Sequence, residues 1–92
     1  MVHHWFTVKI EFTKVGYIIN MRFTEVFTKL ISHENVRQTE LAKALNVSRQ
    51  AITNLKNGSS LPSLDVLCAI AKYFDVSTDY LLGLEDEFGN RL

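Results

Sequence analysis

The stretch from Gln38 to Pro62 reads QTELAKALNVSRQAITNLKNGSSLP. Apolar residues recur in it at helical spacing in two successive runs, one on each side of Asn46. The first run consists of Leu41, Ala42 and Leu45, and the second of Ala51, Ile52 and Leu55. The pattern predicts two short helices that share one core and are joined by a tight turn.

The residues between and after the two runs favour this arrangement. Asn46 tolerates the positive φ that a turn between helices requires. Ser48 can accept a hydrogen bond from a free backbone N–H in the first turn of the next helix. Gly58 is suited to end that helix, and Pro62 blocks simple continuation. We therefore expect the second helix over residues 48–57.

Polar side chains occupy the positions of the second helix that the core does not use. They are Arg49, Gln50, Thr53, Asn54 and Asn57. These groups can form hydrogen bonds to base edges or to phosphates. An ordinary solvated helix face has a similar composition, so the row alone leaves both interpretations open.

Several motifs along residues 38–82 occur together in one known family. They are Gln38, Glu40-Leu41-Ala42, Val47-Ser48-Arg49, Ile52, Asn57-Gly58, Pro62-Ser63, Ala71 and Leu81-Leu82. In this combination the chain resembles the helix-turn-helix domain of the phage repressor and Cro family, also called the Xre family. The resemblance extends to about residue 22 when the preceding helix is included. It implies a mainly α, five-helix repressor-like domain.

The resemblance also implies a role for the second motif helix, which would lie in the major groove of double-stranded DNA. There each base pair offers a distinct pattern of donors and acceptors. Arg49, Gln50 and Asn54 would read bases, with Thr53 close enough for a smaller contact. Arginine suits guanine, whereas glutamine and asparagine suit adenine, and each good pair contributes about 1–3 kcal/mol of discrimination.

A second set of residues would position the domain on the DNA backbone. Gln38, Ser48 and Asn57 match family positions that hold phosphates through side chains and helix-terminal N–H groups. Arg37 and Lys43 are further candidates for salt-sensitive attraction to phosphates.

Two positions depart from the family pattern. Many relatives pair an arginine in the first helix with a glutamate near the end of the recognition helix, whereas this chain has Ile31 and Lys56 there. We expect Ile31 to enlarge the core and Lys56 to point outward, where it becomes another phosphate-binding candidate. Arg37 stands where relatives often have a capping Thr, and the lost cap is expected to cost about 1 kcal/mol unless another group satisfies those amides. In exchange, Arg37 could gain a phosphate contact.

Three further helices are predicted around the motif. The first, near residues 21–33, has an apolar face made of Phe23, Val26, Phe27, Leu30 and Ile31. Ser63 is a suitable cap for the next helix, whose packing face would consist of Leu64, Leu67, Ile70, Ala71 and Phe74. A last short helix would begin at Ser77, end at Gly83 and pack through Tyr80, Leu81 and Leu82. Asn35 and Asp75 are predicted helix-terminating residues.

The two ends of the chain fall outside this pattern. In residues 1–20, Phe6, Val8, Ile10 and Phe12 alternate with polar residues, which predicts one strand of a β-hairpin. The hairpin would pack on its own domain or on a second subunit, and a start at Met21 would make it dispensable. Residues 21–84 form the predicted DNA-binding domain, and residues 85–92 a loosely ordered acidic C-terminal tail.

The formal net charge is zero, but the charges are unevenly distributed. Residues 22–56 hold six Lys or Arg against three Glu, whereas residues 57–92 hold two basic residues against six acidic ones. Positive charge therefore lies on the helices expected to meet DNA, which could orient the domain during encounter. Clusters of this size also occur on ordinary solvated surfaces.

The composition argues against several other classes of protein. Cys68 is the single cysteine, so it cannot form an internal disulfide, and we expect it to be a small core residue. His3, His4 and His33 form no recognisable catalytic or metal-binding set, and neither an enzyme nor a cofactor is expected. No apolar run approaches the roughly 18 residues of a membrane helix, so we expect a cytoplasmic protein.

These observations predict a sequence-specific DNA-binding transcriptional regulator, expected to be a repressor that binds a two-half-site operator as a homodimer. Half-sites about 34 Å apart are typical of such dimers. The alternative is an interaction module, such as the antitoxin of a toxin–antitoxin pair. In that case a protein, for instance a toxin or an antirepressor, would be the partner.

Overall fold

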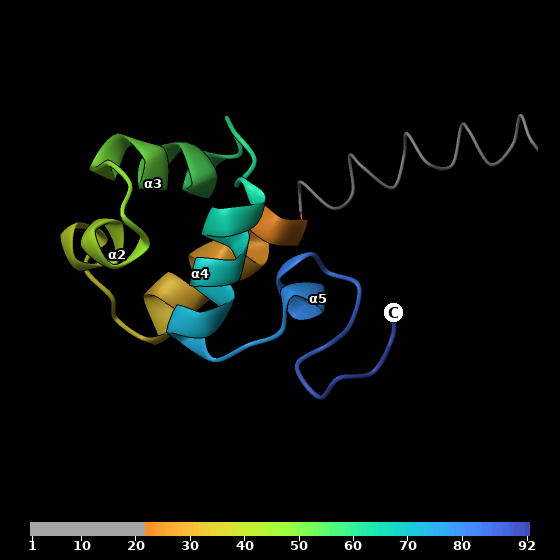
Figure 1. The fold of residues 1–92 in the computed structure, drawn as a ribbon. Coiled ribbons are helices and arrows are strands. Elements are labelled where there is room, and N and C mark those ends of the chain that lie inside the picture. Colours follow the sequence, from red (N-terminus) through yellow and green to blue (C-terminus); the bar gives the residue numbers. More distant parts are fainter. Residues whose placement is uncertain (1–21) are drawn as a thin grey trace, which may run out of the picture.

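The computed structural model describes residues 22–92 and is mainly helical, as the sequence predicts. Residues 22–33 are helical, and four labelled helices follow them (Figure 1). These are α2 (Gln38–Leu45), α3 (Arg49–Asn57), α4 (Leu64–Phe74) and α5 (Thr78–Leu81). The predicted helix-turn-helix arrangement is confirmed. The hairpin predicted for residues 1–20 lies outside the described residues.

One apolar cluster holds these helices together. Every helical segment contributes to it, and its fully buried members are Phe23, Phe27, Leu41, Ile52, Ile70 and Leu81. Burying a side chain of this size contributes about 1.5–3 kcal/mol. The rings of Phe23 and Phe27 lie one helical turn apart and stack with their centroids 5.4 Å apart. Ile31 is also buried, which confirms that it enlarges the core.

The chain uses the same short connection in three places. Asn35, Asn46 and Asp75 adopt left-handed conformations with φ of 52°, 57° and 54°. After each of them, the N–H of a valine bonds to the carbonyl five residues back, as in a Schellman motif. These bonds are Val36 to Ile31, Val47 to Ala42 and Val76 to Ala71, at 3.1, 2.9 and 3.0 Å. All three valines pack against the core.

The residue after each valine begins the next helix. Arg37, Ser48 and Ser77 have the same extended backbone, with φ of −78°, −78° and −77°. Ser48 accepts a hydrogen bond from the N–H of Ala51, and Ser77 from that of Tyr80, both at 3.0 Å. Arg37 makes no side-chain cap for α2. The expected loss of a cap at Arg37 is therefore confirmed.

Residues 84–92 form a closed turn, which differs from the loosely ordered tail expected from their composition. Glu85 and Arg91 form an antiparallel bridge. The carboxylate of Asp86 accepts hydrogen bonds from the backbone N–H groups of Phe88 and Asn90, both at 2.9 Å. Composition misses this turn because its stability comes from one aspartate satisfying successive N–H groups.

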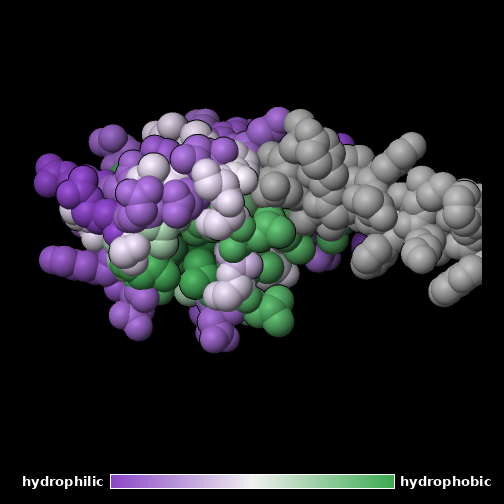
Figure 2. All heavy atoms as spheres, turned by 90° about the horizontal axis from the view of Figure 1, so that it is seen from above, coloured by the Kyte–Doolittle hydropathy of each residue, from purple (hydrophilic) through white to green (hydrophobic). Residues whose placement is uncertain are grey.

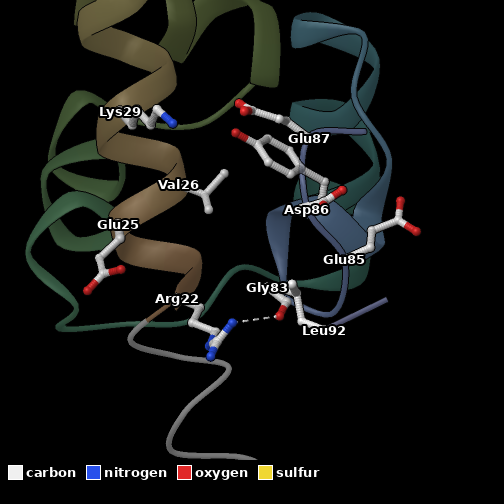
Figure 3. A pocket seen from close by; sticks show the side chains of 10 residues that line it. Arg22, Glu25, Val26, Lys29, Gly83, Glu85, Asp86, Glu87 and Leu92 are labelled. Atoms are coloured by element: carbon white, nitrogen blue, oxygen red, sulfur yellow. Dashed lines mark hydrogen bonds between the residues drawn. The ribbon is translucent and has the colours of Figure 1, made fainter. Parts of the chain in front are cut away.

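The first helix faces this turn across an open groove (Figure 3). Arg22 donates from Nη1 to the carbonyl of Gly83 at 3.1 Å and so links the two sides. Gly83 has φ of 76°, and a Cβ atom there would lie 2.3 Å from the Cδ of Arg22. A glycine therefore serves both the backbone conformation and the close approach of Arg22.

Two predictions about α4 are wrong. Cys68 is exposed and is not a core residue. Leu64, predicted to pack, is 80% exposed. The buried face of α4 consists of Leu67, Ile70 and Ala71. Cys68 is rotated away from that face by the helical period, and Leu64 lies one turn before it, where α4 has passed the edge of the core. Ser63 caps α4 as predicted, by accepting from the N–H of Val66.

We expect the turn of residues 84–92 to open in acid. The backbone N–H of Asn90 lowers the pKa of the Asp86 carboxyl from its ordinary value of 3.8; partial burial opposes this effect, while the Asn90 side chain and the Phe88 N–H add to it. Because this pKa is lower in the folded turn than in the unfolded chain, the ionised carboxylate stabilises the turn at pH values above the unfolded-state pKa. The stabilisation is lost as the pH falls through the folded-state pKa. The amide shift of Asn90, followed by NMR, should therefore show a transition below pH 3.8. The transition should be absent from Asp86→Asn, and its persistence there would assign it to another group.

Arg37→Ser should stabilise the fold, because it makes the first connection equivalent to those at Ser48 and Ser77. The new hydroxyl can accept from the N–H of Glu40, and we expect the free energy of unfolding in urea to rise by about 1 kcal/mol. Ser48→Ala is the matched control, because the bond that its hydroxyl accepts from the N–H of Ala51 is the cap itself, and it should lower the free energy of unfolding by a similar amount. A decrease for Arg37→Ser would show that the arginine itself stabilises the start of α2.

Candidate nucleic-acid interface

Helix α3 is held by its apolar side. Ile52 is fully buried and Leu55 is 4% exposed. Ser48 caps the helix at its start, and Gly58 ends it with φ of 80°. These bounds confirm the helix predicted over residues 48–57. Because its apolar side is embedded in the core, α3 presents the opposite side to solvent at one end of the molecule (Figure 1).

The predicted base-reading residues lie on this outward side. Arg49, Gln50 and Thr53 are exposed and Asn54 is half-buried. Gln50 donates from Nε2 to Oδ1 of Asn54 at 3.1 Å, one helical turn away. This bond orients the Gln50 amide and uses only one of its two N–H groups. The other N–H of Gln50 and its Oε1 remain as an adjacent donor and acceptor. This pair is complementary to the acceptor N7 and the donor N6–H on the edge of adenine.

Thr53 is tied into a chain of hydrogen bonds that joins α2 to α3. Its hydroxyl donates to the carbonyl of Arg49 at 3.3 Å. The same hydroxyl accepts from Nε2 of Gln38 at 3.2 Å. The hydroxyl hydrogen of Thr53 is therefore used within the protein. What Thr53 can offer a base is its methyl group and one acceptor lone pair.

Lys56 does not project freely, which corrects the expectation that it points outward. It is half-buried, and its Nζ donates to Oε1 of Gln38 at 3.2 Å. Ile31 occupies the position from which a polar partner would have come and offers Lys56 no acceptor. The acceptor that Lys56 uses is the amide oxygen of Gln38. Sequence reasoning missed this contact because no spacing rule links residues on two different helices.

The other phosphate-binding candidates lie around the same two helices, and within residues 22–92 no hydrogen bond joins any two of them. Ser48 and Asn57 lie at the two ends of α3, whereas Arg37 and Lys43 are exposed on α2 or at its start. Oδ1 of Asn57 accepts from the N–H of Ser59 at 2.9 Å and also from its hydroxyl. The amide nitrogen of Asn57 is thereby left to act as a donor.

Basic and acidic side chains are concentrated at different ends of the molecule. Of the six Lys or Arg residues in 22–56, four lie in α2 and α3 or at the start of α2: Arg37, Lys43, Arg49 and Lys56. The other two, Arg22 and Lys29, belong to the first helix and line the groove beside the acidic turn. The acidic turn of residues 84–92 lies at the opposite end of the molecule from α2 and α3 (Figure 1). Figure 2 shows hydrophilic side chains gathered over the α2–α3 end. A polyanion would therefore be attracted to the end that carries the polar row.

A metal-binding cluster, a membrane-spanning helix or a ligand groove in residues 22–92 would point to a different function. This part of the chain contains no group of three or more His, Cys, Asp or Glu residues that could hold a metal ion. Its helices also include none that is long and apolar enough to cross a membrane. The groove of Figure 3 has Arg22 and Lys29 on one side and Glu85–Glu87 on the other, so its lining favours no one charge of ligand.

Comparison with known proteins agrees with this geometry. The helix-turn-helix family matches residues 31–81, which include α2, α3, α4 and α5. The chain belongs to the Xre-like helix-turn-helix family. The match covers both helices of the motif together with α4 and α5, and it begins near the end of the first helix. No solved structure matches the chain significantly.

Curated relatives of this helix-turn-helix protein carry regulatory names. The HTH-type transcriptional activator BcrR of Enterococcus faecalis is 38% identical over 66 residues, which are 72% of this chain and 32% of that protein. An uncharacterized HTH-type transcriptional regulator of Methanocaldococcus jannaschii, MJ0272, is 42% identical over 53 residues, 58% of this chain and 80% of that protein. One from Haemophilus influenzae is 33% identical over 73 residues, 79% of this chain and 62% of that protein. The chain thus spans about a third of the enterococcal relative and four fifths of the archaeal one.

Proposed function

We propose that this protein is a sequence-specific, DNA-binding transcriptional regulator that places α3 in the major groove. The observation that carries the proposal is the orientation of α3, which buries Ile52 and Leu55 and turns Arg49 and Gln50 to solvent. The major groove accepts an α-helix and distinguishes all four base pairs. The regulatory names of the relatives support the same role, and such a protein would act in the cytoplasm.

We propose that Arg49, Gln50 and Asn54 read bases, with a smaller contribution from Thr53. Arg49 offers the forked donors that match O6 and N7 of guanine. The Gln50 amide is already oriented by Asn54 at 3.1 Å, so less conformational freedom is lost when it binds adenine. Because the Gln50 amide is oriented before DNA binds, it favours one particular base over non-specific binding to any sequence.

Phosphate contacts would come from residues that surround α3. We propose Gln38, Ser48 and Asn57 as neutral donors, with Arg37 and Lys43 as cationic contacts. The hydroxyl of Ser48 accepts from Ala51, and its hydrogen remains to be donated. Contacts of this kind set the register of the domain on DNA and carry no sequence information. The unit that binds would be residues 21–84.

We further propose that the protein binds two half-sites as a homodimer and represses transcription. Two recognition helices about 34 Å apart enter successive major grooves on one side of the duplex. Repression requires only occupancy of the operator, whereas activation also requires a contact with the transcription machinery. Because the enterococcal relative is named an activator, a promoter–reporter assay with and without the protein tests the direction of regulation.

Arg49→Ala and Gln38→Ala should weaken DNA binding in different ways. Arg49→Ala removes a base contact, so its binding free energy for the preferred site should be weaker by about 1–3 kcal/mol. Its base preference at one position should also be relaxed. Gln38→Ala removes a phosphate contact and should weaken binding more evenly across sequences. The measurement is a titration of preferred and scrambled sites, the preferred site being selected from random DNA, at several salt concentrations.

Arg91→Ala is the matched control, because Arg91 is exposed on the turn at the other end of the molecule. It should leave both affinities unchanged. Equal losses of affinity for Arg49→Ala and Gln38→Ala on the preferred and the scrambled DNA would contradict the assignment of Arg49 to a base and Gln38 to a phosphate. Failure of random-site selection to enrich any sequence would contradict sequence-specific binding and favour a protein partner, such as a toxin.

A further inference from the structure

The amide of Gln38 is held from two sides, and the chemistry of its neighbours fixes which way it faces. Lys56 has only N–H donors, so the Gln38 atom 3.2 Å from Nζ must be the carbonyl oxygen Oε1. The amide nitrogen then faces Thr53, whose Oγ1 lies 3.2 Å away. Thr53 can accept there because its own hydrogen is donated to the carbonyl of Arg49. Each of these three hydrogen bonds therefore joins a donor to an acceptor, and one N–H of Gln38 Nε2 is left over.

The position of Lys56 on α3 makes this contact available. Lys56 lies three residues after Thr53, so both side chains are on the same side of the helix. Gln38 is the first residue of α2 and packs against that side. Lys56 also lies in the last turn of α3, where the helix dipole favours a cation. On the neighbouring first helix, the buried Ile31 gives the ammonium no competing acceptor.

We propose that Lys56 is a positioning residue that fixes the orientation of the Gln38 amide for DNA binding. With Oε1 held by Lys56, Nε2 keeps one N–H on Thr53 and has a second N–H to donate to a phosphate oxygen. The opposite orientation would turn Oε1 away from Lys56 and present an acceptor to a phosphate, which is itself an acceptor. This inference rests on the proposed function and changes the role of Lys56 from a phosphate contact to the support of one.

A double-mutant cycle tests the inference in the full chain. Lys56→Met keeps most of the aliphatic stem and removes the ammonium, and Gln38→Ala removes the amide that the ammonium orients. We expect each to weaken binding to the selected site by about tenfold, because a hydrogen bond to a charged phosphate is lost or disordered. The double variant should bind no more weakly than Gln38→Ala alone, since Lys56 acts through Gln38.

Lys72→Met is the matched control, because Lys72 lies in the last turn of α4 as Lys56 does in that of α3. It should leave the affinity unchanged. Urea unfolding of every variant separates loss of binding from loss of folding. If Lys56→Met weakens binding as much in the Gln38→Ala background as in the wild type, Lys56 contacts DNA directly and the inference is overturned.

NMR of the side-chain amide of Gln38 provides a readout that needs no DNA. In Lys56→Met its two N–H signals should shift and exchange with solvent faster, whereas Lys72→Met should leave them unchanged. Unchanged signals in Lys56→Met would overturn the inference even if binding were weakened. If the wild type bound no DNA, the proposed function and the phosphate role of Gln38 would both fail. The amide signals would still decide whether Lys56 orients Gln38.

Discussion

Burial of Ile52 and Leu55 fixes the rotation of α3 about its own axis, and the character of the outward face follows from that rotation. Successive helical residues are turned by about 100°, so a helix that commits these two side chains to the core exposes Arg49, Gln50 and Thr53. The core that receives them is built from every helical segment of residues 22–92. A reading helix needs this rigidity because a hydrogen bond to a base edge tolerates little misplacement.

The directions of the helices are set by a connection that recurs three times, in which a left-handed Asn or Asp is followed by a core-packed valine. The left-handed residue ends one helix, the valine anchors the turn, and the next residue begins another helix. Ser48 and Ser77 satisfy a backbone N–H there, whereas Arg37 does not. The uncapped connection is the one that places a positive charge beside Gln38. The chain thus forgoes a local stabilising bond at Arg37, and under the proposed function this cation would attract phosphates.

The polar groups around α3 are arranged before any partner arrives. Asn54 orients Gln50, and Lys56 and Thr53 orient Gln38. In each case a flexible amide gives up part of its conformational freedom during folding, so less is lost on binding. The two amides differ in what they retain, since Gln50 keeps an N–H and a carbonyl oxygen with no hydrogen bond to the protein, whereas the carbonyl oxygen of Gln38 is bound by Lys56 and its remaining N–H is the donor it offers. That difference suits one to a base edge and the other to a phosphate.

Local sequence sufficed for the helices, their caps and the residues of the outward row, because each follows from helical spacing or from the preferences of Asn, Ser and Gly at helix ends. It misplaced Leu64 and Cys68, since spacing shows which residues share a face but not where the core stops. It also missed the bond between Lys56 and Gln38, which joins residues 18 positions apart on different helices. Contacts of that kind form only after packing has brought the helices together. The tertiary structure alone therefore decided that Lys56 donates to Gln38.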